Sequence, residues 1–324
     1  MEKFVKRVLE AGGDITPLII PAKITNGTGT FNPSIFNDGG KLLLNMRHCQ
    51  VTIFHSERGV FEHSWGPLSY MNPENDISLT TTNYMCTLND DMFIETHHKV
   101  DMSKFNKKPI WEFIGLEDAR IVRWEGKLYL CGVRRDTTVN GQGRMELSEI
   151  EISDYGVREL SRDRIPAPGA DDTYCEKNWM PILDMPFHFI KWCNPTEIVK
   201  YNPQSKKTET VFVGKYEPHE FDYRGGSQIV PFGEYYLTIV HTVDHLKSEG
   251  GKKDAIYRHL FIVWDKNWNA VKYSKPFTFL DTRIEFCTGM TFYKGNILLP
   301  FGVVDNASFM LKIPIKFLED YLNE

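Results

Sequence analysis

Short apolar runs separated by turn residues dominate the chain from Thr30 onward. Gly, Asn, Asp and Pro interrupt these runs before they reach helical length, which is typical of β-strands joined by tight turns. A helical pattern occurs only near the ends, over residues 1–12 and 315–322. The pattern therefore predicts an all-β protein with short terminal helices.

Five of the apolar runs resemble one another, because each begins at or near a turn and ends in polar or charged residues. They are GKLLLNMRHC from Gly40, GKLYLCGVRRD from Gly126, FHFIKWCN from Phe187, GEYYLTIVHTVD from Gly233 and GNILLPFGVVD from Gly295. Such a repeat is typical of four-stranded blades that bury their faces only against their neighbours. We therefore predict a five-bladed β-propeller, with two β-sandwich domains divided near residues 166–169 as the second layout.

A propeller brings the innermost strands of all its blades to one central channel. We therefore expect the polar strand ends to gather there although they are far apart in the sequence, and these ends supply Arg47, Asp118, Arg134, Lys177, His241 and Asp305. The expected layout is one domain, with an N-terminal extension over 1–27, the propeller over 28–313 and a C-terminal helix over 314–324. The segment 246–255, LKSEGGKKDA, is expected to be an exposed, mobile excursion.

The densest group of charges is GLEDAR, residues 115–120, which leads directly into the apolar Ile121 and Val122. A buried strand would hold the carboxylates at its start rigidly, which is favourable for a catalytic role. A charged turn, in which Glu117 or Asp118 pairs with Arg120, explains the same residues equally well.

Composition narrows the classes of function. A formal net charge of -5 without a basic stripe gives no reason to expect nucleic acid as a partner. No apolar run approaches the roughly 20 residues that span a bilayer, and MEKFVKRVLEAGG lacks the apolar centre of a signal peptide, so we expect a cytoplasmic protein. The six cysteines show no CxxC spacing, and neither HExxH nor a glycine-rich phosphate loop occurs, so no disulfide, metal or organic cofactor is predicted.

The expected channel would be rich in cations. Arg47, Arg134, Arg135, Lys177 and His241 could together hold a dianion, since guanidinium groups match phosphate oxygens and lysine adds a point charge. Taken singly, each is more often a solvated rim residue, and a histidine such as His241 within an apolar strand is more often a core residue. The binding hypothesis depends on their convergence.

Several segments resemble glycoside hydrolase family 130, the mannoside phosphorylases and related mannosidases, which are five-bladed propellers. GLEDAR resembles the family's GxEDPR signature, and the resemblance covers about residues 28–313 in the same order. The other matching segments are FNPS at 31–34, LLNMR at 43–47, GGSQI at 225–229, the strand from 236 to 244, FCTG at 286–289 and PFGVVD at 300–305.

The resemblance implies an inverting phosphorylase that acts on β-mannosides or related oligosaccharides. Asp118 falls on the general acid, which protonates the glycosidic oxygen through a sugar hydroxyl while inorganic phosphate, the co-substrate, attacks the anomeric carbon from the opposite face. Substrate contacts are implied for Asn32, Arg47, Glu117 and Asp305, and phosphate contacts for Arg134, Lys177 and His241. The expected partners are thus an oligosaccharide and phosphate or a sugar phosphate, and the oligomeric state stays open.

Two departures from the family pattern keep other functions open. Ala119 replaces the usual proline, and EKNWMP at 176–181 resembles a branch with features of glycosyltransferase family 108, which uses nucleotide-sugar and sugar-phosphate donors of mannose. Trp179 could then stack on a nucleotide base, although packing between blades is the more frequent role of a tryptophan.

A hydrolase and a non-catalytic carbohydrate-binding propeller are the remaining alternatives. A hydrolase needs a second carboxylate to activate water, and the candidates are Glu57, Glu176 and Glu285.

Overall fold

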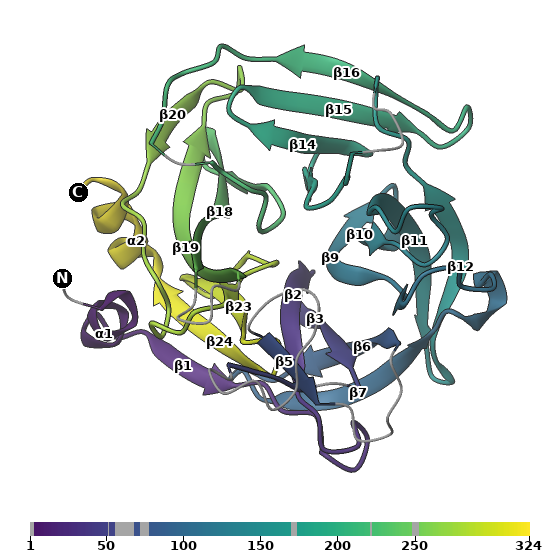
Figure 1. Ribbon diagram of the computed structural model, residues 1–324. Helices are drawn as coiled ribbons and strands as arrows, with labels where there is room; N and C mark the ends of the chain where they lie inside the picture. Colours follow the sequence, from purple (N-terminus) through teal and green to yellow (C-terminus); the bar gives the residue numbers. More distant parts are fainter. Residues whose placement is uncertain are drawn as a thin grey trace.

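Strands hydrogen-bonded in small antiparallel sheets surround a central axis, and each sheet presents its edge to that axis (Figure 1). The computed structural model describes residues 3–50, 52–55, 68–71, 78–169, 174–220, 222–247 and 253–324. Within these ranges the sheets form the five blades of a β-propeller, so the predicted all-β fold is confirmed.

The first two blades join at their outer edges. Blade 1 contains β2 (Thr30–Asp38), β3 (Lys41–Cys49), β6 (Leu79–Leu88) and β7 (Ile94–Asp101). Blade 2 contains β9 (Glu117–Trp124), β10 (Lys127–Arg134), β11 (Arg144–Ser153) and β12 (Gly156–Arg164). β7 and β12 pair in parallel, which makes the two blades one continuous sheet.

The next three blades are separate sheets. Blade 3 contains β13 (Met180–Pro181), β14 (His188–Cys193), β15 (Thr196–Asn202) and β16 (Lys207–Val213). Blade 4 contains β17 (Val230–Phe232), β18 (Tyr235–Lys247), β19 (Lys253–Trp264) and β20 (Ala270–Tyr273). Blade 5 contains β21 (Glu285–Phe286), β22 (Thr291–Tyr293), β23 (Asn296–Val303), β24 (Ala307–Pro314) and β1 (Asp14–Pro17).

Smaller elements complete the chain. They are the helices α1 (Phe4–Glu10) and α2 (Ile315–Leu322), the 3-10 turn η1 (Ser103–Phe105), the strand β8 (Phe113–Ile114) beside β6, and the hairpin of β4 (Thr52–His55) and β5 (Leu68–Met71). Both terminal helices were predicted. Among the described residues, no helix combines the length and apolar character required to cross a membrane.

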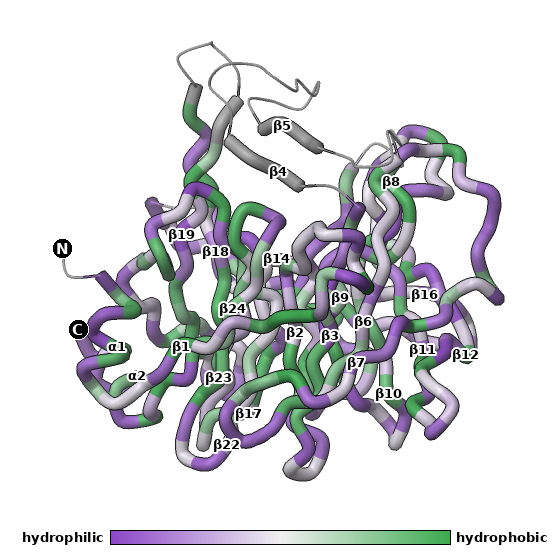
Figure 2. The backbone as a smooth tube through the Cα atoms, turned by 90° about the horizontal axis from the view of Figure 1, so that it is seen from below, coloured by the Kyte–Doolittle hydropathy of each residue, from purple (hydrophilic) through white to green (hydrophobic). Residues whose placement is uncertain are grey.

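The middle strands read as continuous apolar runs because each blade is packed on both faces. In β3, for example, Leu43 belongs to a core cluster shared with Ile121 of blade 2, whereas Leu44 belongs to one shared with Met310 of blade 5. Figure 2 shows this distribution, with hydrophobic residues in the strands and hydrophilic residues in many of the connecting loops. Burial between neighbouring blades therefore holds the ring together.

The N-terminal segment closes the ring. β1 pairs with β24 from Asp14, opposite Lys312, to Pro17, opposite Phe309, so the first strand of the chain is the outermost strand of the last blade. The segment predicted as an extension, residues 1–27, thus contributes a strand to the propeller. α1 covers this closure, with the Phe4 ring stacked on Phe277.

One further expectation needs correction. The five similar runs are the second strands of their blades (β3, β10, β14, β18 and β23), while strands such as β2 and β9 lie nearer the axis (Figure 1). In the segment 246–255, the described residues belong to β18 and β19, and residues 248–252 lie outside the described residues.

A buried glutamine joins four blades near the axis. The Gln228 Nε2 group donates to the carbonyl of Ile35 in blade 1 at 2.9 Å and to that of Ile121 in blade 2 at 2.8 Å. Its Oε1 atom accepts from the backbone N–H of Met290 in blade 5 at 3.2 Å. Gln228 itself precedes β17 of blade 4 and is fully buried.

We expect Gln228→Met to destabilise the propeller strongly. The substitution keeps the shape of the side chain but leaves two carbonyls and one N–H buried without partners, at about 1–3 kcal/mol each, so the free energy of unfolding should fall by roughly 3 kcal/mol or more. Denaturant unfolding measures this change, with Gln204→Met on an exposed turn as the control. Equal stability of the two variants would contradict the proposed bridging role.

Candidate active site

The carboxyl group of Asp118 lies near the axis on β9, where side chains from other blades reach it. Its Oδ1 atom accepts from the Arg47 Nη1 atom at 2.8 Å and from the Asn32 amide at 2.9 Å. Only 15% of the Asp118 side chain and 11% of the Arg47 side chain are exposed. The structure therefore brings together these three predicted residues, from β2, β3 and β9.

Arg47 connects this carboxyl group to its neighbours. Its Nη2 atom lies 3.3 Å from Glu117, its Nε atom donates to the Thr81 hydroxyl at 3.2 Å, and its guanidinium lies 5.0 Å from the centre of the Phe31 ring. Glu117 also lies 3.5 Å from the Nε atom of Arg135. The sequence alternative, in which Glu117 or Asp118 pairs with Arg120, is wrong, because both carboxylates face Arg47.

Arg120 instead binds backbone and amide oxygens. Its Nη1 atom donates to the Asp118 carbonyl at 2.8 Å and its Nε atom to the Gly226 carbonyl at 2.9 Å, while Nη2 lies 3.4 Å from Asn178 Oδ1. The side chain is fully buried. One guanidinium therefore connects blade 2 to the segments that open blades 3 and 4.

The backbone around the axis is held in an unusual conformation. Asn32, Asp118, Asn178 and Asp305 have φ values of +46°, +49°, +61° and +45°. Asn and Asp accept this left-handed region more readily than other side chains, yet it costs free energy, and such strain accumulates at functional sites. The four residues come from four blades, which marks a shared site around the axis.

A register shift in the pairing of β9 sets the orientation of the Asp118 side chain. The pairing of β9 with β10 slips between Cys131 and Val133, so that one stretch of β9 bulges. Gly132 lies opposite the bulge, and a Cβ atom there would come within 2.5 Å of the Glu117 carbonyl. The glycine thus permits the close approach that presents Asp118 to the channel.

The charges around Asp118 and Asp305 push the pKa values of these two carboxyl groups apart. Burial works to raise the pKa of Asp118, but Arg47, the Asn32 amide and Arg120 outweigh it and hold that pKa below its usual value. Burial also raises the pKa of Asp305, and there Arg47 does not compensate for the nearby charges of Asp118 and Glu117, so the value rises to about 6. Asp118 is therefore ionised at neutral pH, while Asp305 protonates readily.

The cations predicted for phosphate do not all meet. Arg134 is buried in ion pairs with Asp136 at 3.0 Å and Glu146 at 2.7 Å, whereas the next residue, Arg135, reaches Glu117. Lys177 is exposed and has no ion pair among the described residues. Of the two arginines that end GKLYLCGVRR, Arg135 is thus the one that reaches the group around Asp118.

His241 is a buried residue of β18, 3% exposed, that stacks on Tyr257 with ring centres 5.3 Å apart. Burial, the neighbouring His259, and then Lys177 and Arg224, lower its pKa well below the usual value. Its ring is therefore neutral at physiological pH and could contact an anion only as a neutral hydrogen-bond donor. Its Nδ1 atom has no hydrogen-bond partner among the described residues.

The acidic residues considered for a hydrolase have other contacts. Glu176 is buried, accepts from the indole N–H of Trp179 at 2.9 Å and lies 3.6 Å from Lys191. Glu285 is also buried and accepts backbone N–H groups of Leu280 and Thr282. Glu57 lies outside the described residues.

Sequence reasoning overlooked Asn178 and Arg224. Asn178 shares the left-handed backbone of Asn32 and Asp118, and in the sequence it likewise stands just before apolar residues of an inner strand. That position was a usable signal. Arg224 offered none, because it follows irregular chain. Its backbone pairs with that of His241, and its charge helps to lower the pKa of that residue.

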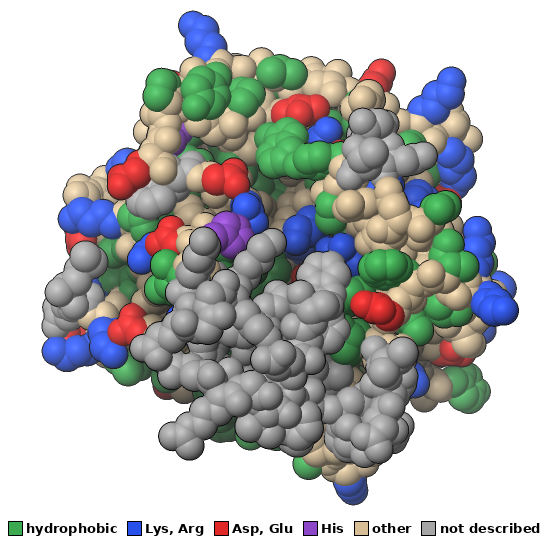
Figure 3. Space-filling model, in the orientation of Figure 1, with side chains coloured by type: hydrophobic (Ala, Val, Ile, Leu, Met, Phe, Trp, Pro, Cys, Tyr) green, Lys and Arg blue, Asp and Glu red, His purple; other side chains and the backbone are tan. Residues whose placement is uncertain are grey.

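Lys and Arg side chains gather around a hollow near the centre of the face shown in Figure 3. Within the described ranges, His, Cys, Asp and Glu side chains form no group of three or more that could hold a metal ion. The arrangement offers one ionised carboxylate, a second that protonates readily, and cations that can receive an anionic or hydroxyl-rich ligand.

No protein-family model and no curated protein match the chain. Solved structures do. A β-1,2-mannobiose phosphorylase from Listeria innocua in complex with β-1,2-mannobiose superimposes with a TM-score of 0.58 at 14% identity, covering 95% of this chain and 96% of that one.

Two proteins from Leishmania mexicana are also similar. A mannose phosphorylase in complex with phosphate ion gives a TM-score of 0.53 at 11% identity, covering 97% of this chain and 93% of that chain. A GDP-Man-dependent mannosyltransferase gives 0.52 at 12% identity, covering 93% and 89%. Mannoside phosphorylases of family GH130 are among the proteins with this fold, in agreement with the resemblance seen in the sequence, and at such identities the likeness concerns the fold.

The raised pKa of Asp305 predicts a stability that depends on pH. Since its folded-state pKa of about 6 exceeds the ordinary 3.8, the contribution of Asp305 to the stability of the wild type should fall as pH rises from about 4 to 6. Asp305→Asn removes this loss and should raise the free energy of unfolding at pH 7.5 by on the order of 2 kcal/mol, with little change at pH 4. Thermal unfolding at both pH values measures the effect.

The control for Asp305→Asn is Asp154→Asn, which removes one negative charge at an exposed turn. If Asp305→Asn is no more stable than wild type at pH 7.5, the crowding of carboxylates around Arg47 does not strain the folded state.

Proposed function

We propose that the protein is an inverting glycoside phosphorylase that acts on β-mannosides or related oligosaccharides. The observation that carries the proposal is that the candidate acid, Asp118, lies near the axis together with Arg47, Asn32 and Asp305. Lys177 adds a cation without a counter-ion among the described residues. An inverting displacement needs one acid and a nucleophile fixed on the opposite face, and phosphate requires cations rather than a second carboxylate.

In the proposed reaction, an oxygen of inorganic phosphate forms a bond to the anomeric carbon as the bond from that carbon to the glycosidic oxygen breaks. The departing oxygen takes a proton that Asp118 supplies through a sugar hydroxyl. The products are a sugar 1-phosphate of inverted configuration and the shortened saccharide. Asn32, Glu117 and Asp305 would bind the sugar beside Arg47, and Lys177 and Arg135 would face the phosphate, with His241 as a neutral donor.

The low pKa of Asp118 fits this scheme only if the ligand changes it. Arg47 and Arg120 help to keep Asp118 ionised. A phosphate dianion near these cations would oppose their effect and raise the pKa of Asp118, since a like charge disfavours the ionised form. We therefore infer that Asp118 gains its proton once phosphate is bound.

The alternatives have less support. A transferase that stacks a nucleotide base on Trp179 is disfavoured, because that residue is 1% exposed and packs in the core, as the more frequent role predicts. For a hydrolase, two of the three candidate second carboxylates, Glu176 and Glu285, have structural contacts of their own, and Glu57 lies outside the described residues. A lectin, which only binds sugars, would not need an aspartate such as Asp118, whose backbone is strained and which lies between Arg47 and Arg120. The fold is shared with phosphorylases of mannosides, with a mannosyltransferase and with glycoside hydrolases, so it supports an enzyme acting on glycosidic bonds and does not itself choose among the three.

Asp118→Asn should abolish most of the activity, because the amide keeps the shape but cannot donate an acidic proton. Turnover of β-mannobiose with phosphate should fall roughly 10²- to 10⁴-fold, the usual contribution of a general acid. Release of sugar 1-phosphate measures it, and circular dichroism confirms the fold. Asp91→Asn, at an exposed turn, should retain activity, and near-normal turnover by Asp118→Asn would remove Asp118 from the mechanism.

Phosphate alone should bind and stabilise the folded protein. At a concentration 100 times its dissociation constant it should add about 2.7 kcal/mol to the free energy of unfolding, which raises the melting temperature. Lys177→Ala should weaken that response, whereas Lys23→Ala, which removes an exposed lysine elsewhere, should not. A melting temperature indifferent to phosphate in the wild type would argue against a phosphorylase.

A further inference from the structure

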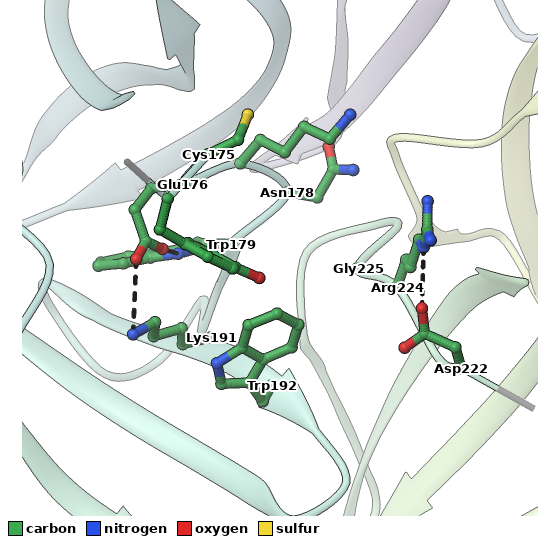
Figure 4. Close-up of a pocket in the computed structure, with 11 residues that line it drawn as sticks. Cys175, Glu176, Asn178, Trp179, Lys191, Trp192, Asp222, Arg224 and Gly225 are labelled. Atoms are coloured by element: carbon green, nitrogen blue, oxygen red, sulfur yellow. Dashed lines mark hydrogen bonds and ion pairs between the residues drawn. The ribbon is translucent and has the colours of Figure 1, made fainter. Parts of the chain in front are cut away.

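A pocket of about 200 Å³, here called the interblade pocket, opens between blades 1 and 2. Residues of β6, of β7 and of the turn after β7 line it from blade 1, and Arg134 at the end of β10 lines it from blade 2. It is distinct from the pocket beside blade 3 that contains Lys177 and Asn178 (Figure 4). None of the residues given a part in the proposed reaction lines the interblade pocket. Its volume suits an ion or a small molecule and leaves no room for a saccharide chain.

Arg134 gives the interblade pocket a buried cation with one free donor. Its Nε atom donates to Glu146 at 2.7 Å, and its Nη1 atom donates to Asp136 at 3.0 Å. Its Nη2 atom is buried and has no hydrogen-bond partner among the described residues. Because buried polar atoms almost always have a partner, the free Nη2 atom indicates a place for an acceptor.

Two more lining residues have donors to spare. The Thr81 hydroxyl accepts from the Nε atom of Arg47 at 3.2 Å, which leaves its hydrogen free, and no acceptor for that hydrogen lies in the described part of the chain. The Asn106 Oδ1 atom accepts from Arg162 at 3.1 Å, whereas its Nδ2 group donates to no residue in the described ranges. Free donors from β6, from the turn after β7 and from β10 suit an oxyanion, which has only acceptors to offer.

Four exposed lysines line the interblade pocket or belong to the segment 104–108 beside it: Lys99, Lys104, Lys107 and Lys108. None of them forms an ion pair with a carboxylate of the described residues. Asp101 is the acid among the described lining residues, and its Oδ1 atom already accepts from the Ser103 hydroxyl at 2.6 Å. Since two carboxylates balance the charge of Arg134, the lysines supply the excess positive charge that attracts an anion.

We propose that the interblade pocket binds a small oxyanion, namely an organic acid or a phosphate ester of a few carbon atoms. Arg134, the Thr81 hydroxyl and the Asn106 amide donate to its oxygens, and Lys99 adds a positive charge. A carboxylate and a phosphate group share this chemistry, because both combine negative charge with several acceptors. The pocket is separate from the phosphate position of the proposed reaction, and its ligand is bound whether or not that reaction occurs.

Calorimetric titration of the whole protein with malonate, and separately with methyl phosphate, tests the site at constant ionic strength. Asn106→Asp keeps the oxygen that accepts from Arg162 but replaces the amide donor with a negative oxygen, so it should weaken the binding of the anion about tenfold or more. Asn202→Asp makes the same change at an exposed turn of blade 3 and should leave the affinity unchanged.

Arg134→Lys is the second variant, because lysine keeps the charge but cannot replace all the donors of a guanidinium. It should lose the binding of the anion as well. Arg134 is buried between two carboxylates, so circular dichroism must first show that this variant folds. If it does not fold, the comparison of Asn106→Asp with Asn202→Asp decides.

Binding that Asn106→Asp weakens and Asn202→Asp preserves would support the site. The anion that binds then identifies the ligand as a carboxylate or a phosphate ester. Binding that Asn106→Asp leaves unchanged belongs elsewhere on the protein, for example in the channel, and would overturn the inference. The absence of detectable binding of both anions at millimolar concentration would overturn it too. The titrations contain no saccharide, so their outcome does not depend on phosphorolysis.

Discussion

The buried guanidinium of Arg120 is the constraint on which the centre of the molecule depends. A buried cation must have its donors satisfied, and among the described residues Arg120 forms no ion pair with a carboxylate, so carbonyl and amide oxygens of three blades converge on it. Those oxygens belong to Asp118, Asn178 and Gly226. The last has no Cβ, and one added there would lie 2.2 Å from the Ile239 carbonyl. Placing Arg120 therefore also places the backbone that presents Asp118 and the wall of the neighbouring pocket.

The second constraint is the crowding of carboxylates around Arg47. One guanidinium faces Glu117 and Asp118 and acts on Asp305, and it cannot neutralise all three. Asp118, which Arg47 binds most directly, stays ionised. Asp305 has the higher pKa and takes up a proton more readily. Divergent pKa values in neighbouring acids are typical of catalytic sites. Here they also explain why an arriving anion, which competes for the same cations, could return a proton to Asp118.

The sequence predicted the architecture because propeller blades repeat one pattern of turn and apolar strand. It also identified Asp118 and Arg47, since polar residues at the ends of strands have to meet near the axis, whereas Asn32 came only from the resemblance to family 130. It could not choose between Arg134 and Arg135, because a slip of one residue moves a side chain to the opposite face of a strand. Nor could it show that Glu176 and Trp179, the first and last residues of EKNW, bind each other, a contact that places both of them in the core.

The innermost strands give the channel its asymmetry. Those of blades 3, 4 and 5 (β13, β17 and β21) have two, three and two residues, whereas β2 has nine and β9 has eight. In blade 3, irregular chain precedes β13, and residues of this chain line a common pocket with Trp192 of β14. Trp179, fixed by Glu176, fills the core, so Trp192 on β14 is left half-exposed toward the opening. An aromatic side chain of the second strand is thus accessible on this side of the axis.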